Sequence, residues 1–123
     1  MMKYKLSYDQ EQDLIVGKVE GEIDPRAVKA MATEFAELVN RSGCRKLLND
    51  LRGAHITSST FDIYNMPRIV DTQGVPISCR RAFLLSGPSE DFNFLETVSI
   101  NVGQQVRIFI NDMEAALEWL REE

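Results

Sequence analysis

Four consecutive hydroxyl side chains, Thr57, Ser58, Ser59 and Thr60, are the clearest candidates for chemistry in this sequence. They directly precede a segment of periodic apolar residues, so one of them is expected to cap the N-terminus of a helix. A phosphate added there would place negative charge at the positive end of the helix dipole and could change which protein binds. We therefore take Ser58, Ser59 and Thr60 as candidate phospho-acceptors or as a partner-binding loop, with simple helix capping as the alternative.

Asp50, Arg52 and His55 precede the hydroxyl cluster and are expected to support it at the same rim of the fold. Asp50 can pair with Arg52 or accept backbone N–H groups. An acid/base enzyme built from Asp50, His55 and the hydroxyls is a third hypothesis, although spacing alone provides no nucleophile–base pair. Because the chain has a single His, and because Cys44 and Cys79 lie outside any metal-ligand spacing, we expect no metal site and no catalytic residues. No phosphate-binding glycine motif is present, and no cofactor is expected.

A second group of side chains, Tyr64, Met66, Phe92 and Phe94, could line a groove between two helices. Aromatic residues at helical spacing usually pack inward, so an ordinary core is the alternative. Phe94 falls off the stripe formed by Phe92 and Leu95, and an exposed Phe at this position would indicate a contact surface. This group predicts a lipid or another small apolar ligand as a second kind of binding partner.

Composition narrows the classes of function. The chain has 123 residues, a net charge of −5 and 44% hydrophobic residues, which is typical of one globular domain over residues 1–123. An acidic chain is a poor binder of nucleic acid, which needs a basic face. No apolar run approaches the roughly 20 residues of a membrane helix, and the N-terminus lacks a signal sequence. We therefore expect a cytoplasmic protein that binds neither nucleic acid nor membrane.

Hydrophobic spacing and capping signals predict nine elements in the order β-β-α-β-α-β-α-β-α. The expected elements are strands at 4–8 and 14–19 with Gly21 ending the hairpin, a helix from Asp24-Pro25 to Gly43, a strand at 46–51 closed by Arg52-Gly53, a helix starting within 57–60, a strand at 81–86, a helix from Ser89 to about Gly103, a strand at 106–110, and a helix opened by Asn111. This alternation predicts an α/β fold with a mixed, mainly parallel sheet and an antiparallel edge strand. The exposed edge of the hairpin could also support a homodimer.

Two details of the second helix are predicted from its residues. Pro67 is expected to bend or interrupt it, because proline removes a backbone donor. Phe61 and Tyr64 are expected on its buried side, together with Ile63 and Val70. Elsewhere, Arg81 and other cationic residues are expected near the starts of strands, at the rim opposite the hydroxyl cluster.

The order of the elements and several segments resemble the SpoIIAA-like, or STAS, fold of anti-sigma factor antagonists and of small uncharacterised bacterial relatives. The segments that carry the resemblance are Leu-Leu-Asn-Asp-Leu-Arg-Gly-Ala at 47–54, followed by the hydroxyl cluster, and the passage from Val-Arg-Ile-Phe at 106–109 into the terminal helix at 112–120. In that family a strand ending in Asp-Leu-x-Gly is followed by Asp-Ser-Ser-Gly, whose second Ser is phosphorylated. The signature falls on Ser58, Ser59, Thr60 and Phe61, so Thr60 takes the phosphorylated position, while Ser58 and Phe61 replace the Asp and the Gly.

The resemblance implies a non-enzymatic regulatory or protein-interaction module of STAS type, with a protein partner and a phosphorylation switch at 57–60. Related proteins have also been likened to CRAL-TRIO lipid-transfer domains. That likeness makes an apolar-ligand groove the second hypothesis.

Overall fold

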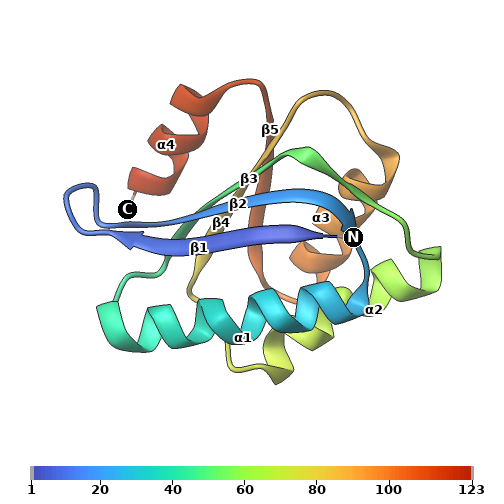
Figure 1. Cartoon of the computed structure of the whole chain (residues 1–123), viewed down its shortest axis with the longest axis horizontal. Coiled ribbons are helices and arrows are strands. Elements are labelled where there is room, and N and C mark those ends of the chain that lie inside the picture. Colours follow the sequence, from blue (N-terminus) through green and yellow to red (C-terminus); the bar gives the residue numbers. More distant parts are fainter. Residues whose placement is uncertain (1, 123) are drawn as a thin grey trace.

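The computed structural model describes residues 2–122, which form strands and helices in the predicted order. The elements are β1 (Lys3–Asp9), β2 (Leu14–Ile23), α1 (Pro25–Ser42), β3 (Lys46–Ile56), α2 (Thr60–Thr72), β4 (Arg80–Leu85), α3 (Glu90–Asn101), β5 (Gln105–Ile110) and α4 (Met113–Arg121). The strands form one sheet in the order β1-β2-β3-β4-β5, in which β1 is antiparallel to β2 and the other neighbours are parallel. The α/β fold with a mixed sheet is confirmed (Figure 1).

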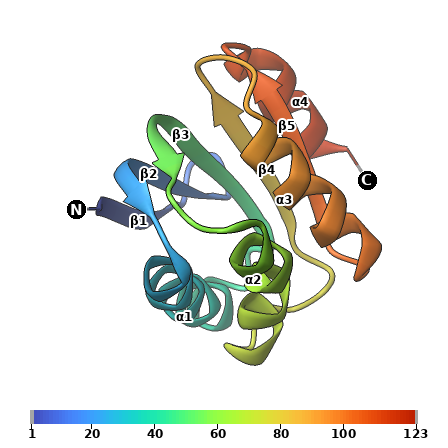
Figure 2. The ribbon, with the colours of Figure 1, turned by 90° about the vertical axis from the view of Figure 1, so that its right-hand side faces the viewer.

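The direction in which the sheet grows decides where the helices lie. Each parallel connection moves one strand further in the same direction, and such crossovers are right-handed. The three connecting helices α1, α2 and α3 therefore cover one face of the sheet. Helix α4 follows the last strand and packs on the opposite face (Figure 2).

Alternation along the central strands separates two cores. Leu47 of β3 and Phe83 of β4 face α1, α2 and α3, whereas Leu48 and Ala82 pack under Leu120 of α4. Because both faces are covered, these strands are apolar on both sides, as parallel strands usually are. The face of the sheet that α1, α2 and α3 cover, to which Leu47 and Phe83 point, borders the cavity described below.

Local capping explains most helix ends. The carboxylate of Asp24 accepts a hydrogen bond from the Ala27 N–H at 2.8 Å, and Pro25 follows it at the first helical position. Gly43 ends α1 with φ = 74°, a conformation that favours glycine. For α4 the predicted cap is wrong by one residue, because the carboxylate of Asp112, rather than Asn111, accepts the hydrogen bond from Ala115.

Two strands are longer than predicted. Strand β2 passes through Gly21 to Ile23, and β3 passes through Gly53 to Ile56. The two extensions pair with each other beyond a register shift after Lys18, and this parallel pairing supplies backbone hydrogen bonds that neither extension could make alone. Residues 52–56 therefore belong to the sheet rather than to a loop.

Helix α2 departs from prediction in two ways. It continues through Pro67 to Thr72, and Pro67 is fully buried, so its ring packs in the core instead of interrupting the helix. Ile63 and Val70 are buried as expected, but Phe61 and Tyr64 are exposed. The reason is geometric: α2 is covered by the sheet, α1 and α3 on one side only, and Phe61 and Tyr64 lie on the other.

Candidate functional site

The hydroxyl cluster lies between the end of β3 and the first turn of α2. Ser59 caps the helix, since its Oγ accepts a hydrogen bond from the Asp62 N–H at 3.1 Å. Ser58 is half-buried, and its hydroxyl donates to the Ile23 carbonyl oxygen at 3.4 Å. Thr60 is exposed, and its hydroxyl makes no hydrogen bond within the described chain. The three candidate hydroxyls are therefore not equivalent: Ser58 is half-buried, Ser59 caps the helix, and Thr60 is exposed with no hydrogen bond among residues 2–122.

Two aromatic side chains continue the exposed surface from Thr60 along α2. Phe61 is 74% exposed and Tyr64, one helical turn later, is 52% exposed. The Arg68 guanidinium lies over the Tyr64 ring, 5.9 Å from its centroid. These residues share one face of the helix because they follow each other at spacings of three and four.

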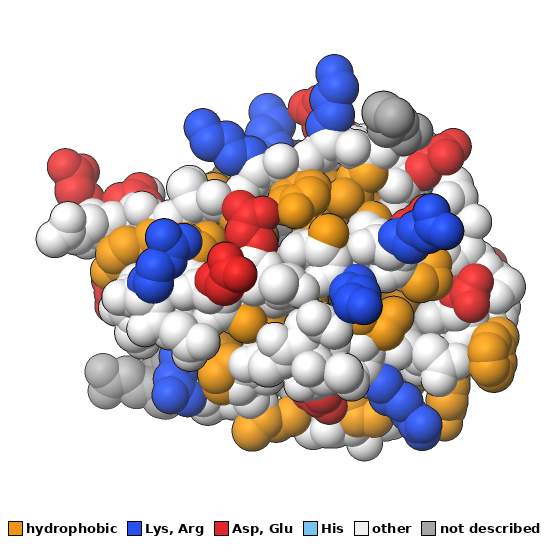
Figure 3. Space-filling view, turned by 60° about the horizontal axis from the view of Figure 1, so that its bottom comes forward, with side chains coloured by type: hydrophobic (Ala, Val, Ile, Leu, Met, Phe, Trp, Pro, Cys, Tyr) orange, Lys and Arg blue, Asp and Glu red, His pale blue; other side chains and the backbone are white. Residues whose placement is uncertain are grey.

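An open groove between α1 and α2 adjoins this aromatic face. Its cationic side chains are Arg26 and Lys29 from α1 and Arg68 from α2, and its other lining residues are Pro25, Asn65, Ile69, Thr72 and Gln73. No carboxylate lines the groove within residues 2–122, although the whole chain is acidic. Figure 3 shows hydrophobic, cationic and anionic side chains interspersed over this helix-covered side. We call Phe61, Tyr64, Arg68, Arg26 and Lys29 the α1–α2 surface.

The three supporting residues do not converge on the hydroxyl cluster. Arg52 donates to Asp50 from its side chain at 2.9 and 2.8 Å, and the two residues share the parity of Leu48, which packs under α4. Exposed His55 lies 3.8 Å from the carboxylate of Glu22 on the neighbouring strand. Asp50 and Arg52 therefore form a pair of their own, on the face of the sheet opposite α2.

The four residues expected to form a groove are divided by the structure. Met66 and Phe92 are buried and line a cavity under the helices. Tyr64 points to solvent from the other side of α2, and Phe94 is not among the lining residues. Phe94 is half-buried against the core cluster that contains Phe92, so it does not provide an exposed contact surface.

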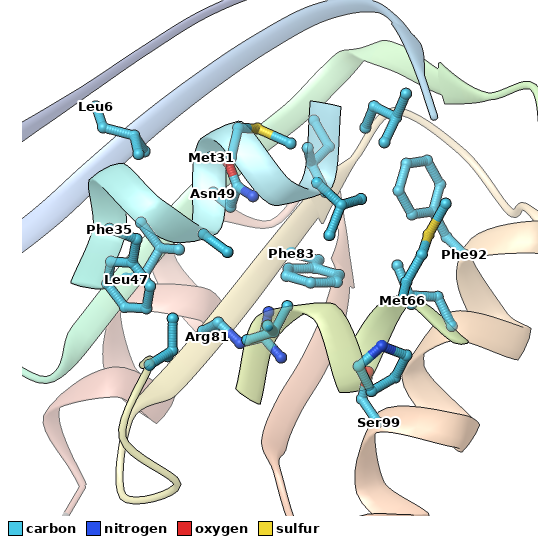
Figure 4. Close-up of a pocket in the computed structure, with 18 residues that line it drawn as sticks. Leu6, Met31, Phe35, Leu47, Asn49, Met66, Arg81, Phe83, Phe92 and Ser99 are labelled. Carbon is cyan, nitrogen blue, oxygen red and sulfur yellow. The ribbon is translucent and has the colours of Figure 1, made fainter. Parts of the chain in front are cut away.

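The cavity lies between the sheet and the helices α1, α2 and α3, and has a volume of about 70 Å³ (Figure 4). Its walls are mostly apolar and come from four strands, three helices and the segment before β4. Two polar side chains of the sheet, Asn49 from β3 and Arg81 from β4, also line it, and Ser99 lines it from α3. Sequence analysis named neither Asn49 nor Arg81 as a site residue.

Comparisons with known proteins bear on the fold. No protein-family model matches the sequence, and no curated protein matches it significantly. Solved structures do match. A crystal structure of an anti-sigma factor antagonist from Mycobacterium paratuberculosis has a TM-score of 0.60 and 14% identity, covering 99% of this chain and 96% of that one. A DUF3478-family protein with a SpoIIAA-like fold from Shewanella loihica PV-4 has a TM-score of 0.60 and 15% identity, covering 98% and 95% of the two chains.

The anti-sigma factor antagonist SpoIIAA in its unphosphorylated form aligns with 98% of this chain and 100% of its own length, at a TM-score of 0.56 and 14% identity. The Bacillus cell fate determinant SpoIIAA in its phosphorylated form aligns with 97% of this chain and 100% of its own, at 0.53 and 15%. The fold is SpoIIAA-like.

The described residues of this SpoIIAA-like fold provide neither a metal site nor a membrane-spanning helix. No three His, Cys, Asp or Glu side chains of residues 2–122 come close enough together to hold a metal ion. None of the four helices is long and apolar enough to cross a membrane. The SpoIIAA-like fold of this chain thus offers two features for function, the α1–α2 surface beside Thr60 and the cavity beneath the helices.

Proposed function

We propose that this chain is a non-enzymatic interaction module of STAS type, which binds a partner protein through the α1–α2 surface. The observation that carries the proposal is the exposed pair Phe61 and Tyr64, placed directly after the accessible hydroxyl of Thr60. Two of the structurally similar proteins support it, because they are anti-sigma factor antagonists, which act on another protein, and SpoIIAA has a phosphorylated form.

The aromatic pair favours a protein partner for an energetic reason. Single exposed apolar residues are common on protein surfaces, but two large rings on one turn of a helix form a ready anchor. Covering Phe61 and Tyr64 would recover about 25 cal/mol for each Å² of apolar surface removed from water. Tyr64 also offers a hydroxyl, as aromatic residues at interfaces often do.

The positive charge of the groove beside Phe61 and Tyr64 indicates the charge of the partner. Arg26, Lys29 and Arg68 form a local concentration of positive charge on a chain whose net charge is −5. Electrostatic complementarity mainly sets the rate and specificity of association. We therefore infer that the partner presents acidic side chains around an apolar patch, and that its association slows as salt is added.

A phosphate on Thr60 would affect the contact between the partner and the α1–α2 surface. It would add about 1.5 to 2 negative charges beside Phe61. The charge would suit the N-terminus of α2, so the helix itself would tolerate the modification. It would repel an acidic partner, however, and we infer that phosphorylation of Thr60 releases the partner.

The non-enzymatic part of the proposal rests on the surroundings of His55. In the described chain its nearest ionic partner is Glu22, and no hydroxyl of the cluster is hydrogen-bonded to it. Without a nucleophile–base pair there is no basis for acyl or phosphoryl transfer. The two cysteines, Cys44 and Cys79, are buried and free, which favours a reducing compartment, and we place the protein in the cytoplasm.

The test of partner binding compares two matched surface variants in the cells that encode the protein. Tagged wild type, the double variant Phe61→Ser/Tyr64→Ser and the control Ile100→Ser are expressed at equal levels and purified, and bound proteins are quantified by mass spectrometry. Ile100 is as exposed as Tyr64, at 52%, but lies on α3. We expect one partner to be reduced at least tenfold by the double variant alone. Equal recovery from all three proteins, or no partner for any, would contradict the proposal.

The switch is tested on Thr60 itself. Intact mass and peptide mapping of the protein from the same cells should locate phosphate on Thr60, and Thr60→Val should abolish it while Thr57→Val does not. Thr60→Glu should lower recovery of the partner, whereas Thr60→Val should retain it. Phosphate found elsewhere, or a partner unaffected by Thr60→Glu, would remove the switch from the proposal.

A further inference from the structure

Arg81 is a buried cation that has no carboxylate beside it. Only 9% of the residue is exposed, and its guanidinium forms no ion pair within 4.0 Å among residues 2–122. One amino group donates to Oε1 of Gln104 at 2.5 Å, and the guanidinium lies over the Phe83 ring, 5.7 Å from its centroid. Gln104 in turn donates to the carboxylate of Asp71 at 3.0 Å, so hydrogen bonds link Asp71 to Arg81 only through this amide.

One side-chain hydrogen bond and one aromatic contact do not compensate a guanidinium for the loss of its hydration. It carries five N–H donors, and burying its charge is costly unless the charge is paired. Burial lowers the pKa of Arg81 to about 10, which still leaves it charged at neutral pH. Arg81 is also one of the residues that line the cavity.

Asn49, which also lines the cavity, has a polar atom without a hydrogen-bond partner. Its Oδ1 is buried and accepts no hydrogen bond in the described chain, and the residue is 9% exposed. Strand pairing puts Asn49 next to Phe83 and Leu47 next to Arg81, so both polar side chains rise from the same face of neighbouring strands. Figure 4 shows them reaching from the sheet towards α1 and α2. An acceptor without a hydrogen-bond partner and a cation without an ion pair therefore line one cavity.

The residues around these two groups are apolar. Met31 of α1, Leu51 of β3, Met66 of α2 and Phe92 of α3 line the part of the cavity near Phe83. At roughly 10–15 Å³ for each water, a cavity of about 70 Å³ corresponds to about five waters, the space of a benzene-sized apolar group. The cavity thus offers one positive charge, one acceptor and a small apolar compartment.

The geometry points to a small aliphatic hydroxy acid as the occupant of this cavity. Its carboxylate would pair with Arg81, its hydroxyl would donate to Oδ1 of Asn49, and its short carbon chain would lie among Met31, Met66 and Phe92. A carboxylate fits better than a phosphate, because one guanidinium balances one negative charge and a phosphate carries about 1.5 to 2. This inference does not depend on the proposed partner, because none of the five residues of the α1–α2 surface lines the cavity.

Binding is tested at pH 7 with three probes of equal chain length that match the size of the cavity: 3-hydroxybutyrate, butyrate and butanol. The full chain is first unfolded and refolded to remove any carried ligand, and affinities are measured by calorimetry with amide chemical shifts as the map. We expect the hydroxy acid to bind most tightly and butanol at least tenfold more weakly than butyrate, with shifts centred on Met31, Leu51 and Met66. No saturable binding of either acid, or equal affinity for butanol and butyrate, would overturn the proposal.

Two variants assign the roles. Arg81→Met should weaken the binding of both acids at least tenfold and leave that of butanol unchanged, while the control Arg107→Met, at an exposed arginine of β5, should change nothing. Asn49→Leu keeps the charge and should abolish only the advantage of the hydroxy acid, which also keeps the test open if Arg81→Met does not fold. Unchanged preference in Asn49→Leu would overturn the role of Asn49. Phe61→Ser/Tyr64→Ser should bind all three probes like wild type, so a failed partner experiment and a failed ligand experiment are separable.

Discussion

Arg52 donates three hydrogen bonds to Asp50, two residues earlier on the same strand. The backbone N–H reaches Oδ1 at 3.1 Å, and the guanidinium reaches the two carboxylate oxygens at 2.9 and 2.8 Å. Such a two-pronged contact is more directional than an ordinary surface ion pair. The residues that sequence analysis assigned to the rim of the hydroxyl cluster therefore hold each other instead.

This pair predicts a pH dependence of stability. Hydrogen bonds from the Arg52 side chain lower the pKa of Asp50 below its usual value, so the folded state binds its proton more weakly than the unfolded state. The resulting stabilisation is present at neutral pH and is lost as pH falls through the lowered pKa of Asp50. Because Arg52 is well exposed, we expect Asp50→Asn to cost only about 0.5–1 kcal/mol of unfolding free energy at pH 7.

Urea denaturation of wild type and Asp50→Asn at several values between about pH 7 and pH 2 measures this effect. The two proteins should differ most at pH 7 and converge at the acid end. A difference that stays constant over the whole range would show that the asparagine acts through packing and not through charge.

Gly17 predicts a steric effect beside the cavity. A Cβ at Gly17 would lie 2.8 Å from Oδ1 of Asn49 and 2.8 Å from a methyl of Leu6. We expect Gly17→Ala to cost about 1–3 kcal/mol of unfolding free energy, since the added group must displace both side chains. Gly87→Ala is the matched control, because a Cβ there meets no atom within 4 Å, and it should be neutral or slightly stabilising.

Equilibrium unfolding of wild type, Gly17→Ala, Asn49→Ala and Gly17→Ala/Asn49→Ala forms a double-mutant cycle. The double variant should recover part of the loss, because truncating Asn49 makes room for the new methyl group. Additive losses would show that Asn49 does not restrict the space over Gly17.

The contacts of Arg80 predict how α4 is attached to the sheet. Its Nη1 donates to the carbonyl oxygens of Trp119 at 2.8 Å and Glu122 at 3.0 Å, and its guanidinium lies 5.4 Å from the centre of the Trp119 ring. Hydrogen bonds from a charged donor contribute about 1.5–3 kcal/mol, and we expect Arg80→Met to lose an amount in that range. Arg107→Met is the control: the Arg107 guanidinium lies 5.6 Å from the Phe109 ring centre but makes no side-chain hydrogen bond within residues 2–122, so its loss should stay below about 1 kcal/mol.

Urea unfolding followed by Trp119 fluorescence reports both the free energy and the environment of α4. Amide hydrogen exchange in 113–121 should accelerate in Arg80→Met more than in Arg107→Met. Equal effects of the two substitutions would mean that ring stacking, and not the bonds to the helix end, anchors α4.

The cysteines predict a slow reaction with thiol reagents. Cys44 and Cys79 are buried, and burial raises the pKa of the Cys79 thiol, so little thiolate forms at pH 8. In native buffer both thiols should react only through opening of the fold, about tenfold more slowly for each 1.4 kcal/mol of opening free energy. Absorbance of a disulfide reagent with and without guanidinium measures this difference; a thiol that reacts at the unfolded rate in native buffer would contradict it.

Local signals were sufficient for the order and most ends of the elements. Asp24-Pro25 and Gly43 bound α1, and Ser59 and Ser89 cap α2 and α3, because a cap is made by residues within one helical turn. Local signals could not predict that β3 continues to Ile56. That extension depends on pairing with the end of β2, which lies more than thirty residues away in the sequence.

The candidate site shows the same division. The four hydroxyls could be placed at the start of a helix from sequence, and Ser59 does cap it. The partial burial of Ser58 and the exposure of Phe61 and Tyr64 depend on which side of α2 the sheet and the other helices cover. Periodicity names the residues of one helical face but does not say how wide the covered part of that face is.

The amino-acid sequence by itself therefore determined the SpoIIAA-like order of elements, because hydrophobic period and capping act over a few residues. Only the tertiary structure decided that Arg81 and Asn49 end in one cavity. Arg81 looked like a rim residue at the start of a strand, and Asn49 like one polar residue within an apolar strand. Their burial follows from three helices crossing the same face of the sheet, an arrangement of distant segments that no local pattern contains.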